Sequence, residues 1–240
     1  MVAISDYKIK NNLKERGNIM SELEILGIDE IEQENTSIDD IESEVINLIF
    51  VAIDGSGSMG MHITDMKDSL QNFKDAITDS KEVDEILVAR ANFNSYIDVG
   101  GYKKITEFDI NYNATGGTLM YDVIIEGTDK LLQYMDYLKQ QGMRVKAVFS
   151  VFSDGKDNSS INILSDAKNK IKELNSKEIT TAFICFGKSA ENEAKMLQFK
   201  NILTVGSSAT ELRKAFDCLS KSVIESSKSV VSKTDNFFSI

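Results

Sequence analysis

The sequence feature that most constrains the fold is an apolar run that ends in a loop rich in side-chain oxygens. Residues 45–53 (VINLIFVAI) are mostly branched and apolar, which is typical of a strand buried on both faces of a parallel sheet. Asp54, Ser56 and Ser58 follow at every second position, and a helical pattern begins shortly afterwards. The order strand, loop, helix predicts an α/β fold with a polar site where the strand ends. Carboxylate and hydroxyl oxygens suit a hard cation such as Mg²⁺.

The same loop supports a competing interpretation. Gly55, Gly57 and Gly60 spell G-x-G-x-x-G between a strand and a helix, which is the pattern of dinucleotide-binding loops. Two observations weigh against it. Asp54 would place a carboxylate beside a bound pyrophosphate, and the next predicted strand ends in Asn92-Phe93-Asn94, without an acidic residue to hold a ribose. A nucleotide-binding domain is therefore retained only as an alternative.

Length and charge indicate one globular domain behind an acidic leader. The chain has 240 residues, of which 42% are hydrophobic, enough for one α/β domain with a full core. Residues 1–44 hold 12 acids and 4 bases, against 26 and 23 in the rest of the chain, so most of the net charge of −11 belongs to the leader. We predict a disordered or edge segment over 1–44, the domain over 45–228, and a polar tail over 229–240.

Composition also excludes several classes of function. There is no basic patch with interleaved aromatic residues, so we expect no nucleic-acid binding. No segment reaches the ~18 apolar residues of a membrane helix, and the first residues lack the apolar core of a signal peptide, so we predict a cytoplasmic protein without membrane binding. Cys185 and Cys218 lack metal-ligand spacing and are predicted to be buried free thiols. The usage of Asn, Lys and Ile favours a bacterial or phage origin.

Alternating periodicities predict the other elements. Further strands are expected at 85–93, 145–153, 178–187 and 201–205, with a short antiparallel strand over 96–105. Apolar positions at helical spacing predict helices around 66–77, 120–138, 164–174, 189–198 and 212–223. This alternation predicts a doubly wound, mainly parallel sheet with one short antiparallel edge strand and helices on both faces, a Rossmann-like arrangement. Asp54 and Asp154 would then meet at the carboxyl edge of the sheet.

Three separated segments resemble the von Willebrand factor A (VWA) domain with its metal-ion-dependent adhesion site. They are Asp54-x-Ser56-x-Ser58 after a buried strand, then Gly116-Gly117-Thr118 followed by Leu119, Tyr121 and Asp122, and finally Ser153-Asp154-Gly155. Their order, spacing and context agree over roughly residues 45–225. One departure is Met120, which stands where the family often has proline, but it is not a ligand position. Asp157 and Asn158 are candidates for supporting the site.

The resemblance implies a role for each residue. Ser56 and Ser58 would bind Mg²⁺ or Mn²⁺ through their hydroxyls, and Asp54 would act directly or through water. Thr118 would bind directly in one state and through water in another, while Asp154 would lie in or next to the coordination shell. One open position would accept an Asp or Glu carboxylate from a protein partner, with AAA+ ATPases or other complex components as candidates. The implied function is a non-catalytic, metal-dependent protein–protein interaction module.

An enzyme with a Mg²⁺ site, such as a phosphoryl hydrolase, is a further alternative. The sequence offers no general base outside the ligand set, no paired nucleophile, and no phosphate-binding Lys or Arg directly after the loop. The nearest candidate, Lys67, lies further along the predicted helix. His62 is the only histidine and is expected to be an exposed helix residue. Taken singly, Ser58 and Asp154-Gly155 are equally consistent with a helix cap and a turn.

Overall fold

The computed structural model describes residues 31, 33–80, 84–206, 208–229 and 235–238. Within them one sheet contains the strands β1 (Val45–Asp54), β2 (Glu85–Phe93), β3 (Ile97–Val99), β4 (Lys103–Lys104), β5 (Arg144–Ser153), β6 (Thr180–Phe186) and β7 (Asn201–Val205). The α-helices are α2 (Ile63–Thr78), α3 (Met120–Gln140), α4 (Leu164–Ser176), α5 (Lys188–Leu197) and α6 (Ala209–Lys228). Short 3₁₀ helices are η1 (Ile38–Asp40), η2 (Gly57–His62) and η3 (Ile105–Glu107).

The strand order is β3-β2-β1-β5-β6-β7, with β4 also paired to β2. β1 is parallel to β2 and β5, and β6 is parallel to β5 and β7, whereas β3 and β4 run antiparallel to β2. The order grows outward from β1 in both directions, so the sheet is doubly wound. The predicted fold class is confirmed, and the antiparallel strand predicted over 96–105 is present as two short strands on either side of Gly100-Gly101.

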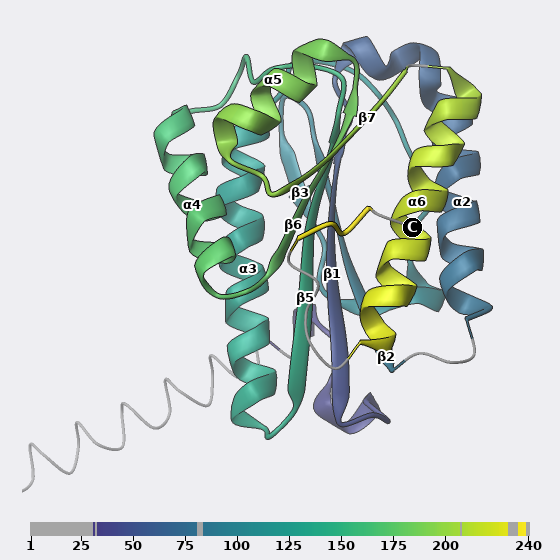
Figure 1. Cartoon of the computed structure of the whole chain (residues 1–240), viewed down its shortest axis with the longest axis vertical. Helices are drawn as coiled ribbons and strands as arrows, with labels where there is room; N and C mark the ends of the chain where they lie inside the picture. Colours follow the sequence, from purple (N-terminus) through teal and green to yellow (C-terminus); the bar gives the residue numbers. More distant parts are fainter. Residues whose placement is uncertain (1–30, 32, 81–83, 207, 230–234, 239–240) are drawn as a thin grey trace, which may run out of the picture.

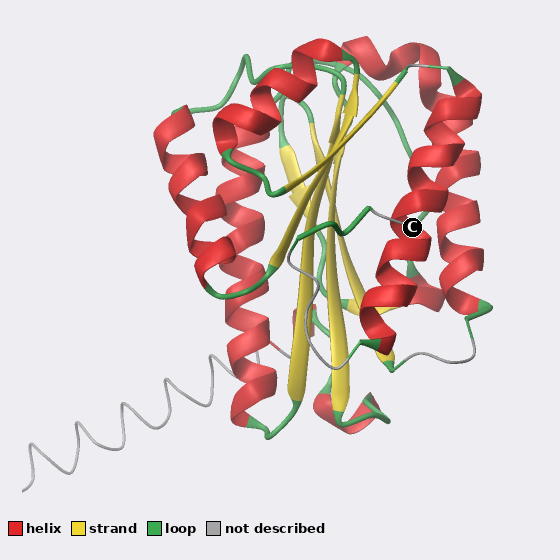
Figure 2. Cartoon of the chain, in the orientation of Figure 1, coloured by secondary structure: helices red, strands yellow, loops and turns green. Residues whose placement is uncertain are grey.

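β1 supplies two cores at once, which explains why its residues are mostly apolar. Ile46, Leu48 and Phe50 belong to the core beneath α3, α4 and α5, whereas Ile49 and Val51 belong to the core beneath α2 and α6. Successive side chains of a strand point to opposite faces, so a strand covered on both faces is apolar throughout. Figures 1 and 2 show the two helical layers on either side of the sheet. None of the helices in the described ranges is both long and apolar enough to cross a membrane.

α3 approaches β1 through a glycine. Phe50 is fully buried and stacks on Phe149, with the ring centroids 4.7 Å apart. A Cβ atom added at Gly127 of α3 would lie 2.2 Å from Cζ of Phe50. The helix therefore lies at a distance from the sheet that only glycine permits.

Part of the acidic leader packs against the domain. Thr36 is buried, and its N–H donates to the Tyr102 carbonyl at 2.8 Å. The Tyr134 hydroxyl in turn donates to the Thr36 carbonyl at 2.8 Å, and Ile41 contacts the core beneath α3. The described part of residues 1–44 is thus docked on the domain and includes η1. Three further apolar residues of this segment lie outside the described residues: Leu23, Ile25 and Ile28.

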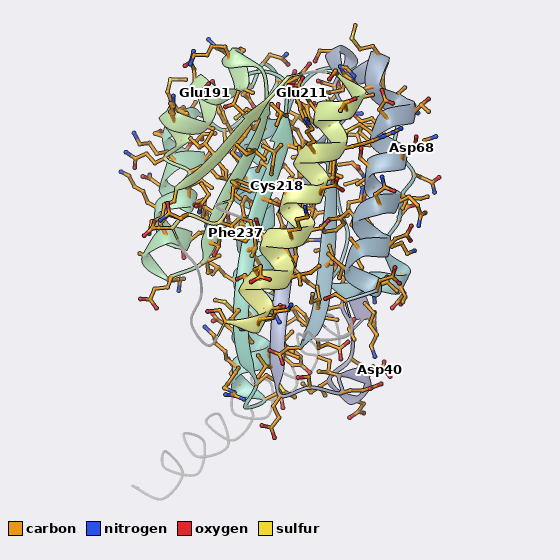
Figure 3. The ribbon with its side chains drawn as sticks, turned by 45° about the vertical axis from the view of Figure 1, so that its right-hand side comes forward. Asp40, Asp68, Glu191, Glu211, Cys218 and Phe237 are labelled. Atoms are coloured by element: carbon orange, nitrogen blue, oxygen red, sulfur yellow. The ribbon has the colours of Figure 1, made fainter. Side chains whose placement is uncertain are left out.

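The C-terminal segment returns to the sheet (Figure 3). Phe237 is buried, and its N–H donates to Oδ1 of Asn201 on β7 at 2.8 Å. Cys185 is buried as predicted, but Cys218 is only half-buried, because it lies beside the apolar stripe of α6 and not on it. Burial raises the pKa of the Cys185 thiol to about 12 and also raises the pKa of Cys218. Neither thiol is therefore a ready nucleophile.

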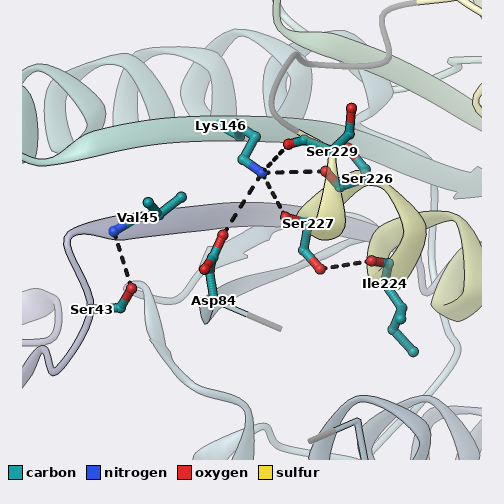
Figure 4. A network of polar contacts seen from close by, with 8 residues as sticks. All are labelled: Ser43, Val45, Asp84, Lys146, Ile224, Ser226, Ser227 and Ser229. Atoms are coloured by element: carbon teal, nitrogen blue, oxygen red, sulfur yellow. Dashed lines mark hydrogen bonds and ion pairs between the residues drawn. The ribbon is translucent and has the colours of Figure 1, made fainter. Parts of the chain in front are cut away.

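A lysine from the sheet holds the last turn of α6 (Figure 4). Nζ of Lys146 on β5 lies 2.7 Å from each of the carbonyl oxygens of Ser227 and Ser229, and 3.4 Å from that of Ser226. Oδ2 of Asp84 lies 3.9 Å from the same ammonium group. The final carbonyls of a helix have no intrahelical partner and carry partial negative charge. Lys146 thus connects the C-terminal end of α6 to the first residues of β5.

Removing this cap is expected to destabilise the fold. Lys146→Met keeps the aliphatic stem but removes the ammonium, so we expect to lose about 1–2 kcal/mol of unfolding free energy. For a chain of this size that lowers the melting temperature by about 2–8 °C. Lys172→Met, at an exposed lysine of α4, is the control and should change stability by less than ~0.5 kcal/mol. Equal melting temperatures for the two variants would contradict the capping role.

Candidate functional site

Two of the three motif segments meet where β1 and β5 end. Asp54 is the last residue of β1, and Ser153, directly before Asp154, is the last residue of β5. The two strands are parallel neighbours. In a doubly wound sheet this is the point where the strand order reverses, and ligands collect at the carboxyl ends of the strands there. The fold therefore places both aspartates at the same edge.

The remaining motif segment is attached to this loop by backbone hydrogen bonds. The N–H of Thr115 donates to the Gly55 carbonyl at 2.7 Å, and the N–H of Gly57 donates to the Gly116 carbonyl at 3.0 Å. Gly116 has a φ of +80°, and a Cβ atom there would lie 2.3 Å from Oγ of Ser95. Only glycine meets both conditions, so the glycine pair of this segment has a structural cause.

Four of the five predicted ligands form one hydrogen-bonded chain. Oδ1 of Asp54 accepts from the N–H of Ser56 at 2.8 Å, and the hydroxyls of Ser56 and Ser58 lie 3.0 Å apart. The Ser58 hydroxyl donates to Oδ1 of Asp154 at 2.9 Å. Asp54 and Ser56 are buried, Asp154 is half-buried and Ser58 is exposed. The chain of contacts therefore runs from the interior to an open end at the surface.

Thr118, the fifth predicted ligand, is held through its backbone. Its N–H donates to Oδ1 of Asn158 at 2.9 Å, and its carbonyl accepts from the N–H groups of Asn158 and Ser159 at 3.2 and 3.3 Å. The side chain is buried, but no hydrogen bond joins its hydroxyl to the other four residues, all of which are described. Asn158 thus positions Thr118, and the Thr118 hydroxyl remains available to a ligand.

The start of α3 and the loop after β5 hold each other in place. Oδ2 of Asp157 accepts from the N–H of Tyr121 at 3.1 Å. The carboxylate of Asp122 accepts from the N–H groups of Ile161 and Asn162 at 2.9 and 3.0 Å. N–H groups in the first turn of a helix lack intrahelical partners, and its positive end favours a carboxylate. Both aspartates therefore support the site without belonging to it.

Asp54 is a fully buried carboxylate that forms no ion pair with any described residue. Burial raises the pKa of Asp54, the charge of Asp154 adds to the rise, and hydrogen bonds from Ser153 and Ser56 oppose it. The Ser153 hydroxyl donates to Oδ2 of Asp54 at 2.6 Å. Tyr112, whose hydroxyl donates to the Asp54 carbonyl at 2.6 Å, has its pKa raised by burial and by both carboxylates. Two carboxylates without a counter-ion favour a cation at this edge.

The donor set fits Mg²⁺ or Mn²⁺ better than a softer metal. Carboxylate and hydroxyl oxygens are hard ligands, and each oxygen of Asp54 accepts one hydrogen bond and keeps a second lone pair. Over the ranges that the structure describes, no group of three or more His, Cys, Asp or Glu side chains is placed to hold a metal. The residues that would hold the ion are those predicted: Asp54, Ser56, Ser58, Thr118 and Asp154. Metal binding itself stays a prediction.

The glycine-rich loop has used its N–H groups within the protein. The N–H groups of Gly55, Ser56, Gly57 and Met59 all donate to protein oxygens, at 2.8–3.1 Å. A pyrophosphate on a G-x-G-x-x-G loop needs such groups free. The geometry therefore does not favour the nucleotide-binding alternative.

Sequence reasoning missed Tyr112 and predicted the wrong exposure for His62. The only signal at Tyr112 was an aromatic residue inside a polar loop (FDINYNATGGT). His62 was expected to be an exposed helix residue, but its side chain is only 8% exposed, whereas that of Met61 is 82% exposed. Both residues lie in η2, and because a 3₁₀ helix has three residues per turn, His62 faces the interior. Lys67 lies on α2, as predicted, and lines a cavity of about 400 Å³ together with Gly55.

Comparisons with known proteins connect the fold, but not the site, to other molecules. No family model and no curated protein matches this sequence. The pilus adhesin SpaC from Lactobacillus rhamnosus GG matches with a TM-score of 0.60 at 12% identity, over 78% of this chain and 31% of that chain. A von Willebrand factor type A structure from Catenulispora acidiphila matches with 0.54 at 16% identity, over 75% and 43%. The vWF domain of the type V pili tip protein Mfa5 from Porphyromonas gingivalis matches with 0.57 at 10% identity, over 78% and 98%.

These similarities confirm, for the fold, the resemblance carried by the three motif segments. Identities of 10–16% show the fold alone. The chain spans less than half of the SpaC and Catenulispora chains but nearly all of the Mfa5 domain.

Proposed function

We propose that this von Willebrand factor A fold serves as a non-catalytic protein-interaction module, which holds Mg²⁺ or Mn²⁺ and receives an Asp or Glu carboxylate from a partner. The observation that carries the proposal is the buried Asp54 carboxylate, which has no counter-ion among the described residues and is joined through Ser56 and Ser58 to Asp154 at the surface. Adhesin and pilus proteins with the same fold support an interaction role over an enzymatic one.

The charges of the site explain why it would accept an anionic ligand. Ionised Asp54 and Asp154 contribute two negative charges and the hydroxyls none, so the site is near neutral once it holds a divalent cation. When bound, the metal supplies open coordination positions that an anionic oxygen can fill. Two opposite unit charges 4 Å apart attract by about 4 kcal/mol at an effective dielectric near 20, and desolvation offsets much of this. The carboxylate contact would therefore set specificity more than affinity.

Exposed apolar side chains flank the polar site. The described residues include five large hydrophobic side chains that are exposed, and four of them lie in segments that directly follow β1, β2 or β5: Met61, Tyr96, Ile161 and Ile163. The carboxyl ends of β1 and β5 form the site, and β2 is the parallel neighbour of β1. Apolar groups gathered around a charged centre favour a protein surface as the ligand.

Calorimetric titration with MgCl₂ and MnCl₂ tests the metal site. We expect one site in the wild type and no measurable binding by Asp54→Ala, because the variant removes the buried carboxylate. Asp68→Ala, at a half-exposed carboxylate on α2, is the matched control and should bind as the wild type does. Undiminished binding by Asp54→Ala would remove the assignment.

Two experiments distinguish an interaction module from a Mg²⁺-dependent hydrolase. An interaction module should capture a protein partner in Mg²⁺ but not in EDTA, while circular dichroism shows an unchanged fold. Equal capture in EDTA would place the interface elsewhere. A Mg²⁺-dependent hydrolase should instead cleave p-nitrophenyl phosphate and lose that turnover in Asp54→Ala. An AAA+ ATPase as partner and a cytoplasmic location remain predictions from the sequence.

A further inference from the structure

A cavity of about 400 Å³ lies beside the proposed metal site. Its walls come from the end of β2, from the segment 96–98 and from the loop 111–115, and it shares Gly55 with the motif loop. The volume is in the range of pockets for small molecules. None of its lining residues is one of the five proposed metal ligands, although Tyr112 also donates a hydrogen bond to the Asp54 carbonyl.

Two asparagines line this cavity with free amide donors. Oδ1 of Asn94 accepts from the N–H of Tyr96 at 3.0 Å, and Oδ1 of Asn92 accepts from Nε and Nη2 of Arg90 at 3.1 and 2.7 Å. Because each Oδ1 atom accepts a hydrogen bond from an N–H group, the orientation of both side-chain amides is determined, and each Nδ2 group is the end without an assigned partner. Neither Nδ2 group has a hydrogen-bond partner in the described ranges, and neither is among the buried unpartnered side-chain atoms there, so both are accessible from the cavity. Each can therefore donate to a bound ligand.

The other polar side chains of the cavity add hydrogen-bond acceptors, and the two charged ones carry opposite charges. Asn113 and Thr115 are exposed, and their side chains form no hydrogen bond with the described part of the protein. Lys67 and Asp98 bring one charge of each sign, and neither forms an ion pair there. The lining is thus neutral and offers both donors and acceptors, so it favours neither an anion nor a cation.

Tyr96 places an aromatic ring at this cavity with 65% of its surface exposed. A sugar ring has an apolar face of C–H bonds, which packs on an aromatic ring, and an edge of hydroxyls that both donate and accept hydrogen bonds. An exposed ring next to free amides combines the two kinds of contact.

We propose that the cavity lined by Asn92, Asn94 and Tyr96 binds a neutral carbohydrate of one or two sugar units. The ring of Tyr96 packs on the sugar face, and the Nδ2 groups of Asn92 and Asn94 donate to its hydroxyls. Binding here needs no metal, so it goes beyond the proposed function and does not rest on it.

Saturation-transfer NMR in EDTA tests the proposal. The probes are the methyl glycosides of glucose, galactose, mannose, N-acetylglucosamine and N-acetylgalactosamine. We expect transfer to the ring protons of at least one glycoside, and about tenfold weaker binding by Tyr96→Ala and by Asn94→Asp, as expected for one lost contact. Asn94→Asp keeps the oxygen that accepts from Tyr96 and replaces the amide donor with a negatively charged acceptor. Met61→Ala, at an exposed side chain outside the cavity, should bind as the wild type does.

Transfer to none of the five glycosides would overturn the proposal, and so would transfer that Tyr96→Ala and Asn94→Asp both leave unchanged. If Asn94→Asp does not fold, Asn113→Ala replaces it, because that side chain is exposed. Magnesium titration of Tyr96→Ala separates the two sites: it should bind the ion normally while failing to bind the sugar.

Discussion

Gly127→Ala is expected to destabilise the protein by about 1–3 kcal/mol, although alanine favours a helix over glycine by ~1 kcal/mol. The added Cβ would lie 2.2 Å from Cζ of Phe50. Phe50 cannot retreat, because it is fully buried and stacked on Phe149. Phe50→Ala alone is expected to cost about 3–5 kcal/mol through lost burial and the cavity left behind. Denaturant unfolding measures both losses.

The double variant is the sharper test of this contact. With the ring removed by Phe50→Ala, Gly127→Ala should become neutral or stabilising by up to ~1 kcal/mol, so the two changes are strongly coupled. Gly60→Ala is the control, because a Cβ atom there would meet nothing within 4 Å. Simple addition of the two losses would show that α3 and β1 do not pack as described.

Asp54→Asn is expected to abolish the stabilisation by Mg²⁺ and thereby to reverse which of the two proteins is more stable. In metal-free protein the variant removes a buried charge without a counter-ion and its repulsion by Asp154, so its melting temperature should rise by about 2–4 °C for each 1 kcal/mol gained. With free Mg²⁺ at 100 times its Kd, the wild type should gain about 2.7 kcal/mol and the variant nothing. Thermal melts in EDTA and in Mg²⁺ should therefore rank the two proteins in opposite order.

Asp68→Asn is the control for this reversal, since it changes the same side chain at a half-exposed position. It should follow the wild type in both buffers. An Asp54→Asn variant that is less stable than the wild type in EDTA would mean that the hydrogen bonds from Ser56 and Ser153 outweigh the cost of the buried charge. An equal gain from Mg²⁺ in both proteins would exclude Asp54 from the metal site.

The parts of the fold that could be predicted are those whose physical signal is local. β1, β2, β5 and β6 are buried over most of their length because helices cover both faces of the sheet, and most of their residues are therefore apolar. α2 could be predicted because its buried residues repeat at helical spacing: Met66, Leu70, Phe73 and Ile77. Asp54 and Asp154 could be placed together because both follow strands of one parallel sheet.

The features that could not be predicted depend on contacts between segments whose sequences show no hydrophobic periodicity. The Tyr112 hydroxyl reaches the Asp54 carbonyl from a loop without periodicity. His62 follows the turn of a 3₁₀ helix, so the phase of an α-helix gave it the wrong exposure. Thr36 docks through Tyr102 and Tyr134, neither of which marks itself in sequence as a partner for the leader.

The pairing of β1 with β5 also has a consequence for how the molecule forms. The Ser150 hydroxyl donates to the Phe50 carbonyl across 100 positions of the chain, and the two strands are parallel. Closing so long a loop costs entropy before any contact compensates it, and folds dominated by distant pairings form in about milliseconds to seconds. A nascent chain that has not yet added β5 possesses Asp54 and both serines but not their partner Asp154. The proposed metal binding at this edge would therefore require β5 to be paired with β1 first.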